Sequence, residues 1–498
     1  MMHRSCFNKL KESAALAFAC LVTGAAGVVP AAAAPPPLAV PVSQEEGAGG
    51  QRGFSGYLSS LERSNFLFGD MFGIRTALSK LGISVAIQET SEVLANVTGG
   101  TQTQPAYDGL TQVILQLDTQ RAFGWYGGLL NVSALQLHGY NISANNLLTL
   151  QTQSGISGEP ATRLWELWYQ QKMLPEDRLD IRVGQQSLDQ EFMVNFNGVY
   201  FMNTMFGWPM VPSADLPGGG PAYPLSALGV RLRYRPVNPI TVLAGVYNGS
   251  PTWTSMGNSQ WLNPNGLYFG TGDGVMMIFE LQYTHPSLGE LQEPGSSGPP
   301  LGGTYKIGAW YNSLGFFDQR YDTSGLSLAD PNSNGSPAVH QGNYSLYAVA
   351  DQIVWVDSVN PASSVSLFGR VLWTPQADRN LIDFSMNAGV VRHNPLPNRP
   401  DDILGLGMGY AHVSPSASGL DADTTFFNAQ AGTPVNQIVR QSETYLELTY
   451  LAQVRPWWQI QWDLQYIFNP GGGMVNPNDP TQVFADQLVV GMRTNILF

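Results

Sequence analysis

Apolar and polar side chains alternate along residues 457–468. From Trp458 to Phe468 every second residue is apolar, and the positions from Gln459 to Gln465 between them are polar. A period of two indicates a β-strand with one apolar and one polar face. In a soluble sandwich the apolar face packs on a protein core, whereas in a membrane barrel it faces lipid and the polar face lines a wet lumen. Other features of the sequence distinguish between a soluble sandwich and a membrane barrel.

Similar alternation recurs in segments of about ten residues, which is the length that a tilted membrane strand needs. Sixteen strands are predicted, beginning near Ile83, Leu110, Gly128, Thr162, Arg178, Leu228, Ile240, Val275, Thr304, Tyr344, Val365, Leu381, Ile403, Thr444, Trp457 and Asp486. An even number of antiparallel strands is what a single-chain bacterial barrel requires. We therefore predict an all-β fold, a transmembrane antiparallel β-barrel of about 16 strands over residues 83–498.

The lengths of the connections test this prediction. Most connections after odd strands are long, namely 93–109, 139–161, 189–227, 249–274, 313–343, 414–443 and 470–485. Most of those after even strands are short, such as 175–177, 236–239 and 455–456, although 285–303 is long and the odd connection 375–380 is short. Short periplasmic turns alternating with long outer loops are typical of outer-membrane barrels.

Composition points the same way. Of the 498 residues, 43% are hydrophobic and only 12% are charged, with 12 Trp, 20 Tyr and 22 Phe. The charged fraction is about half that of ordinary soluble domains. A formal net charge of −13 argues against a nucleic-acid partner.

The N-terminus indicates export. A basic start with Arg4, Lys9 and Lys11 precedes an apolar run over 14–29 and small residues at 31–34, so residues 1–34 are predicted to be a cleaved signal peptide. Residues 35–56 read as a flexible lead-in and 57–82 as a short helical segment near the barrel mouth. The last strand ends in Phe498, and an aromatic terminus of this kind is what outer-membrane proteins present to their assembly machinery. We therefore expect the protein in the cell outer membrane.

Strand parity assigns side chains to the lumen. Within 164–171 it places Trp165, Leu167 and Tyr169 outside, and Glu166, Trp168 and Gln170 inside. Within 178–185 it turns Asp180 and Arg182 inward, and within 230–236 it forms an inward ladder of Arg231, Arg233 and Arg235. Arg235, beside Pro236, is expected at the rim. A charge on the lipid face costs roughly 2–4 kcal/mol at the midplane, so parity is an energetic argument.

A channel constriction is predicted from these positions, lined by Arg231, Arg233, Glu166, Trp168, Asp180 and Arg182. Residues 189–227 are too aromatic for a solvated loop, and with Gly218 to Gly220 as a hinge-like break they are predicted to fold into the lumen opposite the ladder. Two alternatives stay open: the charges are solvated or neutralise one another, and the loop packs as a lid beneath its neighbours.

The residue types suit a sugar. Arg donors and Asp or Glu acceptors together satisfy hydroxyls, while a flat aromatic ring covers the C–H face of a pyranose. An anion channel needs the arginines without the acids, and conduction needs weak affinity. Aromatic residues near strand ends, such as Trp373, Trp458 and Phe468, are read as interfacial anchors rather than ligands.

Several stretches resemble the carbohydrate-selective porins of the OprB type. They are GISVAIQETSEVLANVTGG, RVGQQSLDQEF, LSALGVRLRYRP, ETYLELTYLAQVRPWWQIQWDLQYIFNPGGG and VGMR, and the resemblance runs from about residue 66 to 498. It implies a sixteen-stranded outer-membrane channel for passive uptake of glucose and related sugars, with arginines and carboxylates at the constriction. Extended connections at 313–343 and 414–443 depart from the family and put the preferred sugar in doubt.

Other functions remain as alternatives. These are a general, non-selective porin, a soluble glycan-binding sandwich, and an outer-membrane enzyme, which needs a Ser with a His and a carboxylate or amide. The histidines are scattered and no nucleophile elbow is present, so we expect no enzyme, no cofactor and no metal. The expected partners are small sugars, outer-membrane lipid and the assembly machinery, and a homo-oligomer is left open.

Overall fold

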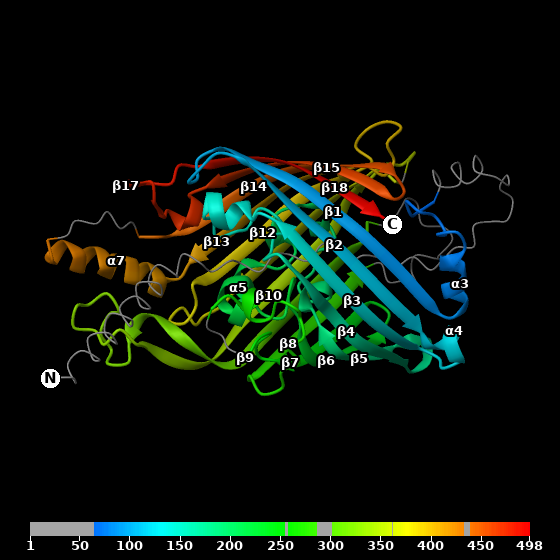
Figure 1. The fold of residues 1–498 in the computed structure, drawn as a ribbon, viewed down its shortest axis with the longest axis horizontal. Coiled ribbons are helices and arrows are strands. Elements are labelled where there is room, and N and C mark those ends of the chain that lie inside the picture. Colours follow the sequence, from blue (N-terminus) through cyan, green and yellow to red (C-terminus); the bar gives the residue numbers. More distant parts are fainter. Residues whose placement is uncertain (1–63, 254–256, 286–300, 361, 433–438) are drawn as a thin grey trace, which may run out of the picture.

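The computed structural model describes residues 64–253, 257–285, 301–360, 362–432 and 439–498. Sixteen strands close into one antiparallel barrel, in which each strand pairs with its neighbour in sequence and β1 pairs with β18 (Figure 1). They are β1 Ile83–Thr98, β2 Pro105–Asp118, β3 Gly128–Gly139, β4 Ala161–Met173, β5 Leu179–Gln186, β6 Ala227–Val237, β7 Ile240–Asn248, β8 Val275–His285, β9 Gly303–Asp322, β10 Pro337–Val356, β11 Ser364–Trp373, β12 Ile382–His393, β13 Ile403–Val413, β14 Ser442–Arg455, β15 Trp458–Phe468 and β18 Gln487–Leu497. The predicted barrel of sixteen strands is confirmed.

Strand β15 answers the question that its alternation raises. Trp462 and Leu464 are exposed on the outside of the barrel, at 48% and 40% of their surface, whereas Gln461 and Gln465 are buried inside it. An exposed apolar band around a polar interior matches a barrel whose solvent is lipid.

Helices are few and short. They are α3 Ile74–Lys80, α4 Thr119–Phe123, α5 Met210–Asp215, α6 Ser259–Leu262 and α7 Pro415–Gln430, with single helical turns at Ser143–Leu147, Pro175–Asp177, Leu188–Gln190, Gly198–Tyr200, Thr204–Phe206, Pro217–Gly219 and Pro470–Gly472. Within the described ranges, none of the helices has the length and apolar character needed to cross a membrane.

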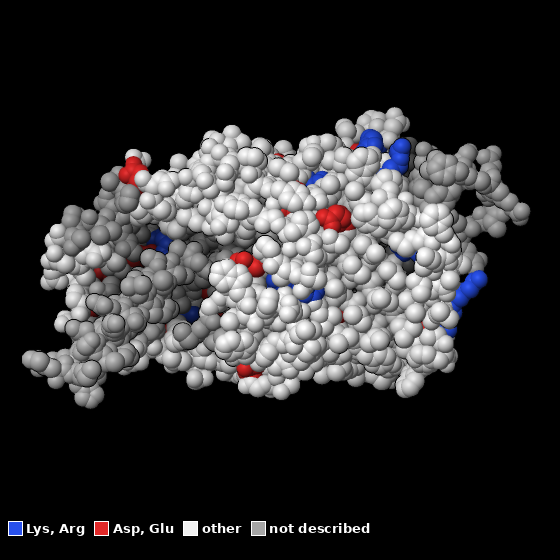
Figure 2. Space-filling view, viewed as in Figure 1, with Lys and Arg blue, Asp and Glu red and all other residues white. Residues whose placement is uncertain are grey.

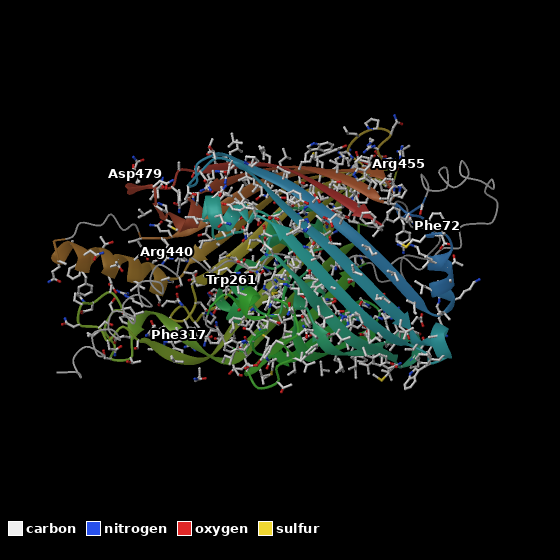
Figure 3. All side chains as sticks on the ribbon, viewed as in Figure 1. Phe72, Trp261, Phe317, Arg440, Arg455 and Asp479 are labelled. Carbon is white, nitrogen blue, oxygen red and sulfur yellow. The ribbon has the colours of Figure 1, made fainter. Side chains whose placement is uncertain are left out.

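Loop length separates the two ends of the barrel. Most of the short turns lie at the end that carries α3, α4 and the last residue of the chain, and most of the long connections lie at the opposite end (Figure 1). Two predicted loops are wrong. Much of 93–109 belongs to β1 and β2, and much of 313–343 belongs to β9 and β10, which run for 20 residues each and project beyond the rim. In this projecting part apolar side chains such as Phe317 still point outward, because β9 and β10 keep pairing past the barrel (Figure 3).

Two other long connections contain secondary structure. The connection 414–443 holds α7, which is fastened to β9 by Arg320, whose Nε lies 2.8 Å from Asp423 Oδ2, and to the chain after it by Arg440 and Asp421. The connection 470–485 holds a small hairpin of β16 Val475–Asn476 and β17 Asp479–Val483.

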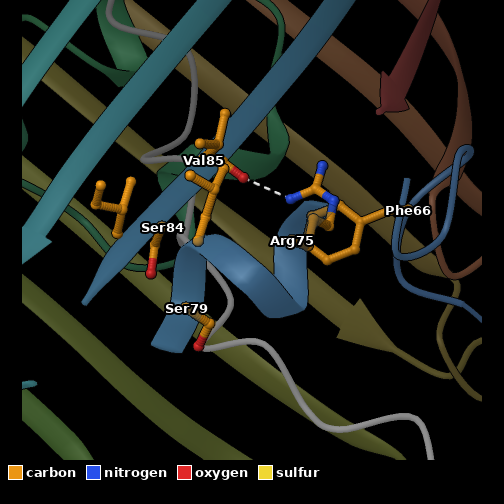
Figure 4. Close-up of a pocket in the computed structure, with 7 residues that line it drawn as sticks. Phe66, Arg75, Ser79, Ser84 and Val85 are labelled. Carbon is orange, nitrogen blue, oxygen red and sulfur yellow. Dashed lines mark hydrogen bonds between the residues drawn. The ribbon is translucent and has the colours of Figure 1, made fainter. Parts of the chain in front are cut away.

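The segment before β1 docks on the seam between the first and last strands. Arg75 of α3 donates through Nη1 to the Val85 carbonyl over 2.5 Å and through Nη2 to the carbonyl of Phe498, and it lies 3.7 Å above the Phe66 ring (Figure 4). Phe66, Arg75 and Val85 border a small pocket between α3 and β1. The predicted signal peptide, the lead-in and residues 57–63 of the predicted helical segment lie outside the described residues.

Two connections fill the lumen. The segment 187–226 folds inward as predicted, with Phe192, Phe206, Trp208 and Tyr223 all buried. The segment 140–160, which the sequence treats as an ordinary outer loop, also folds inward, and most of 142–157 is buried. The two segments pair through backbone bonds, Gly155 N–H to the Met202 carbonyl at 2.7 Å and Thr204 N–H to the Thr152 carbonyl at 3.0 Å.

Candidate functional site

The guanidinium of Arg231 is completely buried in the wall formed by β4, β5 and β6. Its Nη1 pairs with the Asp180 carboxylate, and its Nη2 donates to Gln170 Oε1 over 3.1 Å. Its Nε lies 2.6 Å from Oε2 of Glu191, which belongs to the inward segment. In this conformation Arg231 has no contact with the aqueous lumen, so a direct contact with a solute requires that Glu191 moves away.

Of the two neighbouring arginines, only Arg233 is substantially exposed. Arg233 lies 2.6 Å from Asp180 Oδ2 through its Nε, and 45% of its side chain is exposed. Arg182 pairs with Glu191 at 3.0 Å and stacks 3.9 Å above the Trp168 ring. An arginine stacked on an aromatic ring beside a carboxylate places donors and acceptors side by side, while the guanidinium covers the face of the ring.

Glu166 holds the beginning of the inward segment. Its carboxylate accepts from Trp168 Nε1 at 3.2 Å and from the backbone N–H of Ser187 at 3.0 Å. All six predicted site residues, Arg231, Arg233, Glu166, Trp168, Asp180 and Arg182, therefore lie on one wall. The sequence prediction did not include Glu191 in the site, because it assigned this residue to the inward loop 189–227. Its position just beyond β5 places it beside the arginines of β6.

A β-bulge at Trp165 corrects the predicted parity of β4. Ser133 pairs with Glu166 and Ala134 with Leu164, so Trp165 is an extra residue on its strand. Trp165 is buried against Tyr223, with ring centroids 6.0 Å apart, and does not face lipid as predicted. The bulge shifts the phase of the alternation, so that Arg163 turns inward together with Glu166.

Arg163 is a further buried charge that the sequence does not reveal. Its Nη2 donates to the Glu159 carbonyl at 3.2 Å, whereas its Nε and Nη1 have no hydrogen-bond partner in the structure. On the neighbouring seam Arg493 Nε donates to Glu92 Oε2 at 2.8 Å, and Arg493 Nη2 is also unpartnered. Buried donors without acceptors are costly, and a bound solute or water compensates such a cost.

Carboxylates around the barrel wall hold the inward segment 187–226. Three strands take part, with Glu280 on β8, Asp351 on β10 and Glu447 on β14. They accept from the backbone N–H groups of Met193, of Phe196 and Asn197, and of Met202 and Asn203, respectively. The segment therefore crosses the lumen from β5 to β14, and it contacts the arginine ladder as well as the opposite wall.

Cationic side chains hold the carbonyl groups of the same segment. Lys306 on β9 donates to the Val194 carbonyl at 2.6 Å. Arg370 on β11 is fully buried and donates to three backbone carbonyls, those of Met193 and Gly207 at 2.7 Å and that of Met205. Both signs of charge on the wall thus bind the main chain of the segment.

Glycines on β13 make room for its aromatic rings. Phe201 and Phe206 stack with centroids 4.4 Å apart and lie over the inner face of the strand. A Cβ at Gly405 would lie 2.8 Å from Phe201 Cζ, and one at Gly407 would lie 2.6 Å from Phe206 Cζ. Since these distances are shorter than van der Waals contact, alanine at either position displaces a ring.

Two carboxyl groups in the inward segment are shielded from water. Asp215 accepts from the N–H groups of Leu381 and Ile382, and burial raises its pKa well above the usual range. Asp189 accepts from Ser187 Oγ at 2.5 Å and from the Tyr223 N–H at 2.9 Å, and burial raises its pKa to about 6. Within the described ranges no cluster of His, Cys, Asp and Glu has the makings of a metal site.

A closed barrel with an apolar outer face, a charged interior and inward-folded loops defines a porin-type channel of the outer membrane. The family model described as carbohydrate-selective porin, OprB family, matches residues 102–498, so the chain belongs to that family. Family and fold point to a channel rather than an enzyme.

Individual relatives agree with this assignment. Porin B of Pseudomonas aeruginosa is 25% identical over 430 residues, which cover 82% of this chain and 88% of the relative. A putative porin, QuiX, of Acinetobacter baylyi is 20% identical over 421 residues, covering 82% and 89%. The high-pH structure of Pseudomonas putida OprB superimposes with a TM-score of 0.75 at 23% identity, covering 88% of this chain and 99% of that one, a likeness of fold.

Proposed function

We propose that the barrel gives passive, selective diffusion of glucose and similar small sugars across the outer membrane into the periplasm. The observation that carries this proposal is the group formed by Arg182, stacked on Trp168 and paired with Glu191, beside the half-exposed Arg233. Sugar hydroxyls both donate and accept, so they need cations and acids side by side. Weak, exchangeable contacts of this kind let a solute leave as readily as it enters.

The residues of this wall have different proposed roles. Arg233 is proposed to touch the sugar, because 45% of its side chain is exposed. Arg182 and Trp168 are largely buried against each other and are proposed to contact the sugar at the edge of their stack. Arg231 is proposed as a positioning residue that orients Glu191, and Glu166 as the anchor of Ser187. Asp180 is proposed to neutralise Arg231 and Arg233.

Arg163 extends the proposed site. Its two unpartnered nitrogens are buried inside the barrel beside Glu159, so a sugar hydroxyl can accept from the guanidinium only when the inward segments that cover it move. A hydrogen bond to a charged donor contributes about 1.5–3 kcal/mol. One such contact suffices for selectivity while the overall affinity stays weak.

Single-channel conductance in a planar lipid bilayer tests this function. Purified, refolded protein is titrated with glucose up to high millimolar concentration, and a size-matched polyol that is not a sugar ring serves as the control solute. A saturable fall in ion current with glucose alone supports the sugar channel. Channels that respond equally to both solutes indicate the alternative, a general non-selective porin, and a lack of channels from a verified barrel contradicts both.

Processing and assembly are part of the same proposal. We propose that residues 1–34 are removed on export, which N-terminal sequencing of the protein from outer membranes tests. The last strand, whose Phe498 N–H donates to the Ile87 carbonyl at 2.8 Å, is proposed as the segment that the assembly machinery binds. Deletion of Phe498 is expected to lower the amount of folded barrel without changing the current per channel.

A further inference from the structure

The end of β18 is bound on both of its edges by the segment that precedes β1. The Leu497 carbonyl accepts from the Leu67 N–H over 2.8 Å, and the carbonyl of Phe498 accepts from Nη2 of Arg75. Residues 66–75 are here called the seam clasp. The N–H groups of the same two residues of β18 donate to the chain just before β15 and to β1, so the seam clasp completes the hydrogen bonds of this strand end.

Arg75 also fills a position that β18 leaves open on β1. Pairing between the two strands starts at Gln88, so the first five residues of β1 extend beyond the end of β18. Every second residue of an antiparallel edge turns its carbonyl toward the same neighbour. The Ile87 carbonyl accepts from the Phe498 N–H, and the next carbonyl on that edge, that of Val85, accepts from Arg75 Nη1 over 2.5 Å (Figure 4). The guanidinium thus continues the hydrogen bonding of the seam by one position.

Aromatic rings of the seam clasp enclose this contact. The Cζ atom of Arg75 lies 3.7 Å from the centroid of the Phe66 ring, and the ring centroids of Phe68 and Phe498 are 5.4 Å apart. Arg75 and Phe66 are both only 8% exposed. Other cations at this end of the barrel, such as Lys80, are exposed, and Figure 2 shows cationic side chains at the surface there. Arg75 is therefore part of a built site and not one more surface charge.

The partners of Arg75 meet only in the closed barrel. The Val85 carbonyl belongs to the first strand and the Phe498 carbonyl follows the last one, so the pairing of β1 with β18 brings them together. A guanidinium presents its donors in a rigid fork, which suits two acceptors held at a fixed spacing. The seam clasp is therefore complete only after the seam between β1 and β18 has formed.

We propose that the seam clasp competes with the assembly machinery for the end of β18, so that its docking on the closed seam releases the folded barrel. This inference rests on the assembly step proposed above, in which the machinery binds the last strand. A protein that recognises a strand by pairing with it needs main-chain groups that are not already bonded. In the closed barrel the seam clasp occupies the carbonyls of Leu497 and Phe498, so the machinery and the seam clasp exclude one another.

The seam clasp binds the wall of the barrel and not the inward segments. Its hydrogen bonds go to β1 and to the end of β18, whereas residues 140–160 and 187–226 are held by carboxylates and cations elsewhere on the wall. Weakening the seam clasp should therefore leave the single-channel conductance unchanged, which separates a role in assembly from a role in the pore.

Photo-cross-linking in growing cells tests the competition. A photoreactive residue at Val490, on the outward face of β18, captures the machinery while it holds this strand. The lifetime of the adduct is followed after pulse labelling of the full chain. In Arg75→Gln it should rise by about tenfold or more, because glutamine is shorter and cannot bridge the two carbonyls, and one charged hydrogen bond lost corresponds to about that factor. Lys80→Gln removes a positive charge from the same helix and should leave the lifetime unchanged.

A second variant keeps the test decisive if Arg75→Gln does not fold. Phe68→Ala removes the ring contact with Phe498 and keeps both hydrogen bonds, so the barrel should fold with unchanged conductance and the adduct should persist longer, by a smaller factor. Lifetimes equal to that of Lys80→Gln, or a changed conductance, overturn the proposal. Absence of any adduct with the machinery in the parental chain overturns it together with the assembly step, whereas the block of ion current by glucose tests the sugar channel separately.

Discussion

Arg231 and Glu191 meet at the junction of the barrel wall and the inward segment, with Nε and Oε2 2.6 Å apart. The arginine comes from the middle of β6 and the glutamate from just beyond β5. Their contact fixes where the inward segment leaves the wall, and it neutralises an arginine that is otherwise buried beside a single carboxylate, that of Asp180. Breaking it leaves a buried charge short of a partner.

Glu191→Gln is expected to shift ion selectivity toward anions. The change removes one negative charge from a group in which Arg231 and Arg182 both pair with Glu191. Loss of one partner of a buried pair costs roughly 3–5 kcal/mol, so the inward segment should also become less stable. The reversal potential under a salt gradient measures the shift. Glu176→Gln in the exposed turn after β4 is the control, and an equal shift in both variants would contradict a local effect.

Arg163→Gln is expected to weaken the block of ion current by sugar. It removes the two unpartnered donors of the guanidinium and leaves a shorter, uncharged polar side chain. A loss of about 1.5–3 kcal/mol corresponds to roughly a 10- to 100-fold rise in the half-blocking glucose concentration. Arg392→Gln, on the outer surface beside Trp355, should leave the block unchanged. If the two variants behave alike, Arg163 does not contact the sugar.

Arg370→Met is expected to loosen the inward segment. The methionine fills a similar volume but donates none of the bonds that reach the carbonyls of Met193, Met205 and Gly207. Each charged bond contributes about 1.5–3 kcal/mol, so several kcal/mol of local stability are lost. Hydrogen exchange of residues 193–207 should accelerate and the open-channel current should become noisier. Protection equal to that of the parental protein would show that the remaining anchors suffice.

The inward segment should become less stable as pH rises from about 4 to about 6. Burial raises the pKa of Asp189 from 3.8 to about 6, so the folded state favours the protonated carboxyl. This stabilisation is present below the ordinary pKa and is lost as pH rises through the folded one, a change of about 3 kcal/mol. Hydrogen exchange of residues 187–226 at pH 4.5 and 7.5 measures it. Asp189→Asn should reduce the dependence to the part that Asp215 contributes, whereas Asp177→Asn in the exposed turn should preserve it.

Alternation and loop parity predicted the barrel, because lipid requires every strand to turn apolar side chains outward at every second position. The prediction failed at Trp165, where one extra residue reverses which side chains of β4 face the lumen. Alternation along the sequence gives no sign of such a bulge. Arg163 was missed for that reason. The inward position of residues 140–160 could not be predicted either, because their Ser, Thr, Asn and Gln side chains look solvated until Glu443 is found to accept from Leu150 and Gln151 N–H.

The anchoring of residues 187–226 has a consequence for how such a channel changes. Glu280, Asp351, Glu447, Lys306 and Arg370 bind the main chain of the segment, which is the same for every amino acid except proline. Side chains between the anchors can therefore be exchanged while the backbone path across the pore persists. The wall fixes the backbone of the segment and leaves its side chains free to vary. New solute preferences can therefore be selected, or designed, by substituting a few residues of the segment while the barrel stays unchanged.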